Sequence, residues 1–411
     1  MSVFVKTPRV GTALVFLASG AVQASLFARL PALQDASGAG TAALGTALAV
    51  MGAGTFVGMC TAARHFRTFD DRRIVAVAST LTIGALLGAS YASSPWQLTF
   101  ALLALGVPAG MWDARMNVHA AVVERQAGRH LMTEFHGLWS LGCVVGAGVG
   151  VLAASRGWPV LHQSLVVGGL ALAACLFGVS TFVDRDDAPP RPVPTGRRPF
   201  QPYLAHLIAI IFLGAIIEGA AGDWLAVLLA DERGQSHGAA ASGYLTFVAA
   251  MAVGRLGANR LYRFYPEVSL RQAVLLGTGT AAAGVVLTAY APVGIAVHLG
   301  AVCWGVGICV VFPGVLSVAG RKSDSGRTVA LLSSIGYAAS MAGPIGLGLA
   351  SSALARPDLR LALAVLLPLC AAVAVAVAWW TKPDSEPVRM ESPRQPRVGT
   401  LAFEPTPEGG R

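Results

Sequence analysis

The sequence predicts an all-α membrane protein with twelve transmembrane helices, arranged as two pseudo-symmetric six-helix bundles. The chain has 411 residues, of which 55% are hydrophobic and only 12% are charged. Soluble domains carry about 25% charged residues, whereas a membrane-spanning helix needs roughly 20 mainly apolar residues. Apolar segments of that length recur along nearly the whole chain, so the composition indicates a protein that crosses a membrane many times.

Glycine, proline and charged residues divide the apolar sequence into twelve predicted spans. Their approximate limits are 10–28, 41–63, 74–92, 97–122, 132–154, 160–183, 203–230, 239–262, 270–290, 293–319, 328–353 and 359–381. The first span has no small-residue cleavage site at its end, so we expect a retained helix and not a removed signal peptide.

A proline- and arginine-rich stretch, DRDDAPPRPVPTGRRPFQP, separates the sixth and seventh spans and predicts a cytoplasmic linker over 184–202. It divides the chain into two six-helix bundles, 1–183 and 203–381, and a polar, proline-rich tail over 382–411 is expected to be disordered. Spans five and eleven are the glycine-richest of their halves. Such spacing lets helix backbones approach closely, which suits helices that slide or rock.

Basic residues gather in alternate loops, and this bias predicts the orientation in the membrane. The opposite loops hold few of them: Arg29, Arg156, Arg233, Arg356 and Arg360. Because basic loops stay on the cytoplasmic side, we expect both termini in the cytoplasm and a location in the cytoplasmic (inner) membrane.

Several classes of protein are disfavoured by the residue pattern. The six cysteines lie in apolar segments without C-x-x-C or Cys/His spacing, so neither a disulfide framework nor a metal site is expected. The net charge of +9 sits in short loops, which argues against nucleic-acid binding. Neither H-E-x-x-H nor G-x-S-x-G occurs, and no nucleotide-binding loop is present, so we expect no enzyme and no ATP-driven pump. We expect a monomer.

Five stretches in order resemble one family of membrane proteins: LGVPAGMWDARMNVHAAVVE, GRHLMTEFHGLWSLG, EGAAGDWLAVLL, AMAVGRLGANRL and SSIGYAASMAGPIG. They are similar to the major facilitator superfamily, and within it to the fucose-permease-like branch. The nearest likeness is to uncharacterised bacterial inner-membrane members, including a rhizopine-cluster membrane protein. The resemblance covers about residues 10–381. It implies a secondary transporter of a small-molecule substrate, driven by a proton gradient without any bound cofactor.

The sequence departs from the superfamily's pattern at three places. The loop after the second span, GMCTAARHFRTFDDRR, has Ala62 where an acid is usual, and Asn259 replaces the acid in the second half. This predicts a weakened or differently built inner ion-pair latch. The helix-one acid of the sugar permeases has no counterpart, since that span offers only Gln23. The glycine–proline signature of drug antiporters is absent from the fifth span.

The fourth span contains an unusual polar run, GMWDARMNVHA, in an otherwise apolar segment. Residues i and i+4 share a helix face, so Asp113 lies with Asn117 and Arg115 lies with His119 on nearly the opposite face. Asp113 falls near the midplane, roughly 15 Å from the inner end at about 1.5 Å per residue. We therefore expect Asp113 to face a central cavity.

Four polar residues between Asp113 and the cytoplasmic ends of the fourth and fifth spans are candidates for a gate. Arg115 and His119 fall about 12 Å and 6 Å from the inner end of the fourth span, and Glu134 and His136 of the fifth span lie near the depth of His119, which predicts an inner gate of these four. The alternative is structural: Arg115 snorkels to the interface and pairs with Glu124 or Glu134.

Glu218 on the seventh span supplies a second acid near the midplane. A charge there costs at least about 2.5–3.5 kcal/mol on insertion scales and is rarely idle, and repeat interfaces at this depth bind solute and coupling ions. Desolvation raises the pKa of a carboxyl group, which lets it carry a proton across an apolar stage. We expect Asp113 and Glu218 to couple transport to protons. The alternative is that each makes a fixed hydrogen bond between helices.

Further polar and aromatic side chains are candidates for solute binding, although interfacial snorkelling and helix packing are the competing interpretations. They are Gln23, Arg29, Asn117, Trp139, Asp223, Trp224 and Trp304. A sugar-uptake symporter, a metabolite or drug exporter and a non-transporting sensor or scaffold on a transporter fold all remain open.

Overall fold

The computed structural model describes residues 7–64, 70–127, 131–183, 202–264, 269–292, 294–322, 326–353 and 358–380. The helices of the first half are α1 (Pro8–Phe27), α2 (Leu30–Ser37), α3 (Thr41–Arg64), α4 (Asp71–Ala89), α5 (Pro95–Ala127), α6 (Met132–Ser155) and α7 (Val160–Val179). Those of the second half are α8 (Pro202–Val227), η2 (Leu228–Glu232), α9 (His237–Phe264), α10 (Leu270–Tyr290), α11 (Gly294–Ile308), α12 (Val311–Lys322), α13 (Gly326–Ser352) and α14 (Leu359–Trp380). The predicted linker and tail lie outside the described residues, apart from Pro202.

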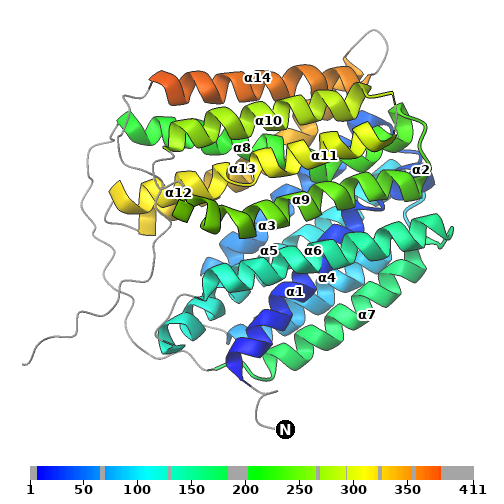
Figure 1. Cartoon of the computed structure of the whole chain (residues 1–411). Coiled ribbons are helices and arrows are strands. Elements are labelled where there is room, and N and C mark those ends of the chain that lie inside the picture. Colours follow the sequence, from blue (N-terminus) through cyan, green and yellow to red (C-terminus); the bar gives the residue numbers. More distant parts are fainter. Residues whose placement is uncertain are drawn as a thin grey trace, which may run out of the picture.

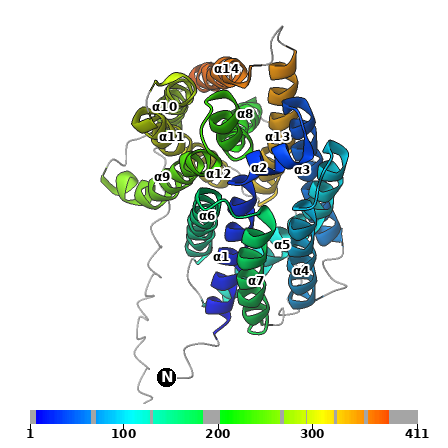
Figure 2. The same cartoon turned by 90° about the vertical axis from the view of Figure 1, so that its right-hand side faces the viewer.

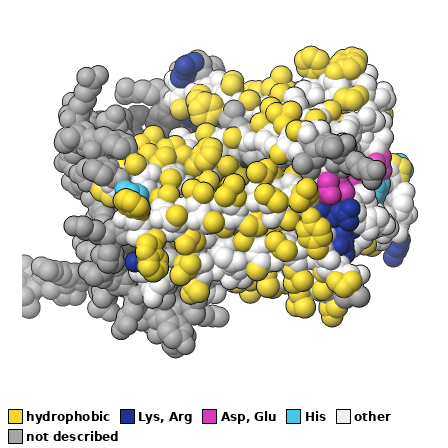
Figure 3. Space-filling view, turned by 90° about the horizontal axis from the view of Figure 1, so that it is seen from above, with side chains coloured by type: hydrophobic (Ala, Val, Ile, Leu, Met, Phe, Trp, Pro, Cys, Tyr) yellow, Lys and Arg dark blue, Asp and Glu magenta, His cyan; other side chains and the backbone are white. Residues whose placement is uncertain are grey.

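The described chain contains 10 helices that are long and apolar enough to cross a membrane. Helices α5 and α13 correspond to the two remaining predicted spans. Large apolar side chains such as Leu170, Leu276 and Ile295 point outward with most of their surface exposed. Figure 3 shows a broad hydrophobic face, with charged side chains gathered toward its right-hand end. An apolar exterior is what hydrocarbon requires, so the predicted membrane fold is confirmed.

Helix pairing repeats between the halves. In the first half α1 contacts α6 and α7, α5 contacts α3 and α4, and α4 contacts α7. The second half makes the same set: α8 contacts α13 and α14, α11 contacts α9 and α10, and α10 contacts α14. Figure 1 shows α8, α10 and α14 on one side of the molecule and α1, α4 and α7 on the other. The two bundles are thus built alike, as the sequence predicts.

Two further pairings join the halves. Helix α3 packs on α13, and its counterpart pairing is α6 on α9. In Figure 2, which looks along the helices, these contacts lie on either side of the centre of the molecule. Any cavity between the halves is therefore flanked by α3 and α13 on one side and by α6 and α9 on the other.

The tenth predicted span is broken into two helices, α11 and α12, at Cys309 and Val310. Pro313 explains the break, because its ring clashes with the carbonyl four residues earlier, at Cys309, and it has no N–H to donate. The loop after the first span is also more ordered than predicted, since it contains α2. Pro31 lies in its first turn, where the missing N–H costs nothing, and Gly38, with a φ of 63°, ends it.

Candidate functional site

A central cavity of about 370 Å³ lies between the two halves, and both predicted acids line it. Asp113 comes from α5 and Glu218 from α8, so each half contributes one carboxylate. Gln23 of α1 and Trp139 of α6 line the same cavity. The structure therefore brings together four of the residues singled out in the sequence.

Asp113 is held by neutral hydrogen-bond donors from both halves. The Tyr337 hydroxyl of α13 donates to Asp113 Oδ2 over 3.0 Å. The Asn117 amide donates to Asp113 Oδ1 over 3.3 Å and to the Asp113 carbonyl over 2.9 Å. Asn117 thus positions the acid from the same helix, whereas Tyr337 ties it to the second half.

Glu218 forms an ion pair with Arg255 of α9, and Arg255 Nη2 lies 2.6 Å from Glu218 Oε1. Both side chains are about one quarter exposed, at 26%. Sequence reasoning did not select Arg255 or Tyr337 as site residues. Arg255 carried a usable signal, because it is a charge within the eighth predicted span. Tyr337 carried none, since a tyrosine is common in membrane helices.

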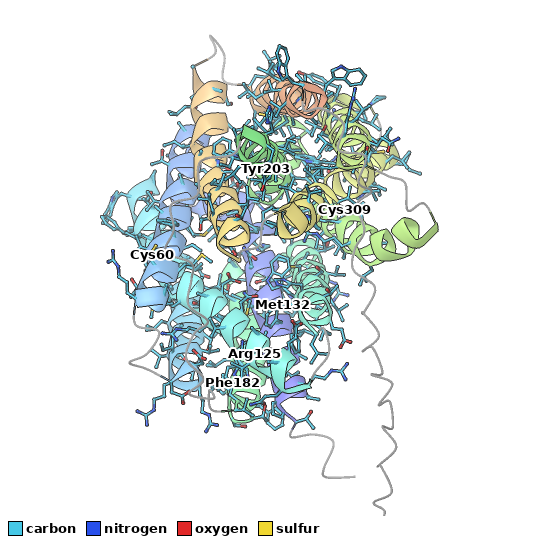
Figure 4. The ribbon with its side chains drawn as sticks, turned by 90° about the vertical axis from the view of Figure 1, so that its left-hand side faces the viewer. Cys60, Arg125, Met132, Phe182, Tyr203 and Cys309 are labelled. Atoms are coloured by element: carbon cyan, nitrogen blue, oxygen red, sulfur yellow. The ribbon has the colours of Figure 1, made fainter. Side chains whose placement is uncertain are left out.

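A second cavity of about 570 Å³ continues the central one toward the end where α6 begins. The two share Asp113, Trp139, Arg255, Phe312 and Tyr337. His136 and Met132 of α6 and Cys309 at the α11–α12 break line its outer part. Figure 4 views this end and labels Met132 on α6 of the first half and Cys309 of the second half. We call this second space the inner cavity.

At the opposite end, which carries α2, the two halves touch. Gln34 Nε2 donates to Asp231 Oδ2 over 2.8 Å, and His237 Nε2 lies 3.0 Å from Asp35 Oδ2. A Cβ atom added at Gly45 of α3 would lie 2.7 Å from the Pro344 carbonyl of α13. The central cavity is therefore closed at the α2 end by direct contacts between the halves.

The predicted cluster of Arg115, His119, Glu134 and His136 does not form, which corrects the expected gate geometry. Arg115 Nη1 instead lies 2.9 Å from Asp71 Oδ1 of α4, and His119 stacks on Phe182 at 3.6 Å. These side chains face α4 and the end of α7, inside the first half. Glu134 pairs with Arg9 at the exposed rim, and only His136 faces a cavity.

Besides Asn117, four of the predicted solute contacts are not among the residues that line the central or the inner cavity. The Arg29 guanidinium donates to Gln163 Oε1 and to the Trp158 carbonyl, and burial lowers its pKa. Trp304 Nε1 donates to the Ile217 carbonyl, which ties α11 to α8.

The other two of these four predicted solute contacts outside the cavity linings are Trp224 and Asp223. Trp224 fills the space beside Gly45 and Gly348, where α3 meets α13. Asp223 is buried one turn from Gly219, which does line the central cavity. The packing interpretation holds for the two tryptophans, because each fills a helix interface.

The family model described as Major Facilitator Superfamily matches residues 12–344. The chain belongs to the major facilitator superfamily. Within this superfamily it is 29% identical over 347 residues to an uncharacterised MFS-type transporter of Yersinia pestis, covering 83% of this chain and 88% of that one. It is 24% identical over 331 residues to the membrane protein MosC of Rhizobium meliloti, covering 80% of each chain. The predicted superfamily is confirmed, while the fucose-permease-like branch stays a prediction.

Solved structures of other superfamily members have the same fold. The nucleoside transporter NupG superposes with a TM-score of 0.66 at 13% identity, covering 91% of this chain and 100% of the other. A D-xylose-proton symporter gives a TM-score of 0.72 at 11% identity, covering 92% and 98%. At such identities the likeness extends to the fold alone.

Proposed function

We propose that this member of the superfamily is a proton-coupled secondary transporter, which moves a small organic solute across the cytoplasmic membrane by alternating access. One observation carries the proposal: Asp113 and Glu218, from different halves, line the same cavity. Transporters built from repeats bind solute and coupling ion at this kind of interface. Ionisable groups inside a membrane are costly, so two of them at one cavity indicate a function.

The closed and open ends fit alternating access. The cavities continue toward the start of α6, while contacts between the halves close the α2 end. With the basic loops in the cytoplasm, this is an inward-facing arrangement. Rocking one half against the other would close the inner cavity and separate the contacts at the α2 end.

Asp113 is the better proton carrier of the two acids. Among the described residues its hydrogen-bond donors are the neutral groups of Tyr337 and Asn117, whereas Glu218 is already neutralised by Arg255. A charged carboxylate accepts a stronger hydrogen bond than a neutral acid does. Protonation of Asp113 therefore weakens its bond to Tyr337, which joins the halves, and couples the proton to their movement.

Flux measured in proteoliposomes tests the proposal. Wild type and Asp113→Asn are compared with a panel of sugars, nucleosides, organic acids and amines under imposed pH gradients, and the direction of flux separates symport from antiport. We expect Asp113→Asn to lose gradient-driven accumulation by about tenfold or more, since about 1.4 kcal/mol of lost coupling energy corresponds to a factor of ten. Solute exchange without a gradient should persist.

Asp358→Asn is the matched control, because Asp358 lines neither cavity and accepts a hydrogen bond from the Leu361 amide at the start of α14. An asparagine caps a helix as well as an aspartate does. Flux that ignores the pH gradient and is equal in wild type and Asp113→Asn would exclude coupling through this residue. No flux for any solute would favour a sensor or scaffold.

A further inference from the structure

Arg255 lines both the central and the inner cavity, and it is the one arginine or lysine among the described residues that do so. It projects from the middle of α9, and a quarter of its side chain is exposed there. A solute moving through either cavity passes this guanidinium. Arg255 is thus placed to contact the solute in the inward-facing arrangement, and it lies beside both acids of the proposed transport site.

The Arg255 guanidinium has more N–H donors than Glu218 accepts from. A guanidinium carries five N–H donors in a planar fork that matches a carboxylate. Glu218 accepts from Nη2, and Nε is buried with no hydrogen-bond acceptor within the described part of the chain. Ionic groups that keep buried donors unmatched are costly unless a partner arrives. A carboxylate that takes the place of Glu218 could accept from both Nη2 and Nε, and would thus match the donor that Glu218 leaves unmatched.

The lining of the inner cavity combines one guanidinium with mainly apolar side chains. Glu218 does not line it, while Arg255 and the imidazole of His136 do. Asp113 is the remaining acid there, and it already accepts two hydrogen bonds. Most other lining side chains are apolar or aromatic, as Leu256, Phe312 and Leu316 illustrate.

We propose that Arg255 binds the carboxylate of the solute, and that the transported class is small monocarboxylates with an apolar or aromatic body. The inference rests on the proposed transport function. The solute carboxylate replaces Glu218 on the guanidinium through a bidentate pair, the strongest contact available to this group. A proton taken up by the released Glu218 leaves the net charge of the site unchanged.

Direct binding to the purified full-length protein tests the solute class without depending on coupling. The probes are monocarboxylates from acetate to naphthoate, each matched with its primary amide and its amine, and quenching of tryptophan fluorescence reports occupancy beside Trp139. We expect carboxylates with ring bodies to bind and their amides and amines to bind at least about tenfold more weakly. Equal binding of the amides or amines, or no binding by any carboxylate, would overturn the inference.

Substitutions at Arg255 and at Glu218 should change carboxylate affinity in opposite directions. Arg255→Gln should weaken it by about tenfold or more, and Arg255→Lys should restore only part, because an ammonium lacks the fork. Glu218→Gln removes the competing carboxylate and should tighten binding severalfold. This gain cannot come from misfolding. Unchanged affinity in both Arg255→Gln and Glu218→Gln would contradict the inference.

The inference and the proposed function fail separately. Proton-driven flux of neutral or cationic solutes alone would contradict the proposed solute class and still support the proposed transport function. Carboxylate binding through Arg255, together with flux that does not depend on the pH gradient, would support the solute class and contradict proton coupling.

Discussion

Ion pairs in this protein differ sharply in their surroundings, and single residues show what each pair contributes. Arg115 and Asp71 are almost fully buried, at 1% and 3% exposure, whereas Arg9 and Glu134 are about half exposed. Removing one partner of a buried pair leaves an unmatched charge, which is far more costly than losing a pair in water. The buried pair joins α5 to the start of α4, so we expect its loss to cost more stability than the loss of the exposed pair.

Asp71→Asn should destabilise the protein strongly, because Arg115 would keep its charge without the carboxylate. We expect a loss of about 3–5 kcal/mol in unfolding free energy, against less than about 1 kcal/mol for Glu134→Gln at the exposed pair. Unfolding in detergent, followed by tryptophan fluorescence, measures both. Equal losses in the two variants would mean that burial does not decide the contribution of these pairs.

Sequence reasoning found part of the site, and the reason lies in what helix periodicity can show. Asp113 and Glu218 stand out because each interrupts an apolar span, and both line the central cavity. Arg115 is predicted to join the inner gate, but Arg115 Nη1 lies 2.9 Å from Asp71 Oδ1 on another helix. Periodicity gives the direction of a side chain and not which helix packs there. For the same reason the hydrogen bond between Asp113 and Tyr337, which lie 224 positions apart in the sequence, was not predicted.

At the scale of the helix, glycines set how closely backbones approach. The glycine-rich fifth span is α6, and Gly142 and Gly146 face the α1 backbone within the same half. The sequence predicts helices that slide or rock, but these two glycines serve tight packing inside one bundle. Helix positions were predictable because apolar length decides them. The break at Pro313 and helix α2 depend on local backbone chemistry, and the prediction missed both.

Alanine substitutions at two glycines of α6 separate packing from helix propensity. A Cβ at Gly146 would overlap the Ala21 carbonyl oxygen, whereas a Cβ at Gly148 meets no atom within 4 Å. We expect Gly146→Ala to cost about 1–3 kcal/mol through overpacking, and Gly148→Ala to be neutral or stabilising by up to about 1 kcal/mol. Thermal unfolding in detergent compares them. A Gly146→Ala protein as stable as wild type would show that α1 and α6 separate easily.

At the scale of the whole molecule, two similar bundles meet through a small set of contacts. Close approach of α3 and α13 involves Gly45 and Gly348, and polar contacts join Gln34 with Asp231 and Asp35 with His237. All of these lie toward the α2 end, away from the inner cavity. The proposed inward-facing arrangement would depend on these contacts, so a wedge at this end should shift the population between arrangements.

Gly45→Trp supplies such a wedge, because an indole cannot fit where even a Cβ would lie 2.7 Å from the Pro344 carbonyl. Spin labels at Tyr91→Cys and Tyr290→Cys, in a background without the six native cysteines, report the distance between the halves at this end. We expect longer distances in Gly45→Trp and a matching loss of solute flux. Gly84→Trp is the control, since a Cβ there meets nothing within 4 Å. Distances that stay at the wild-type values in Gly45→Trp would show that closure at the α2 end does not require this contact, and would remove it from the proposed alternating cycle.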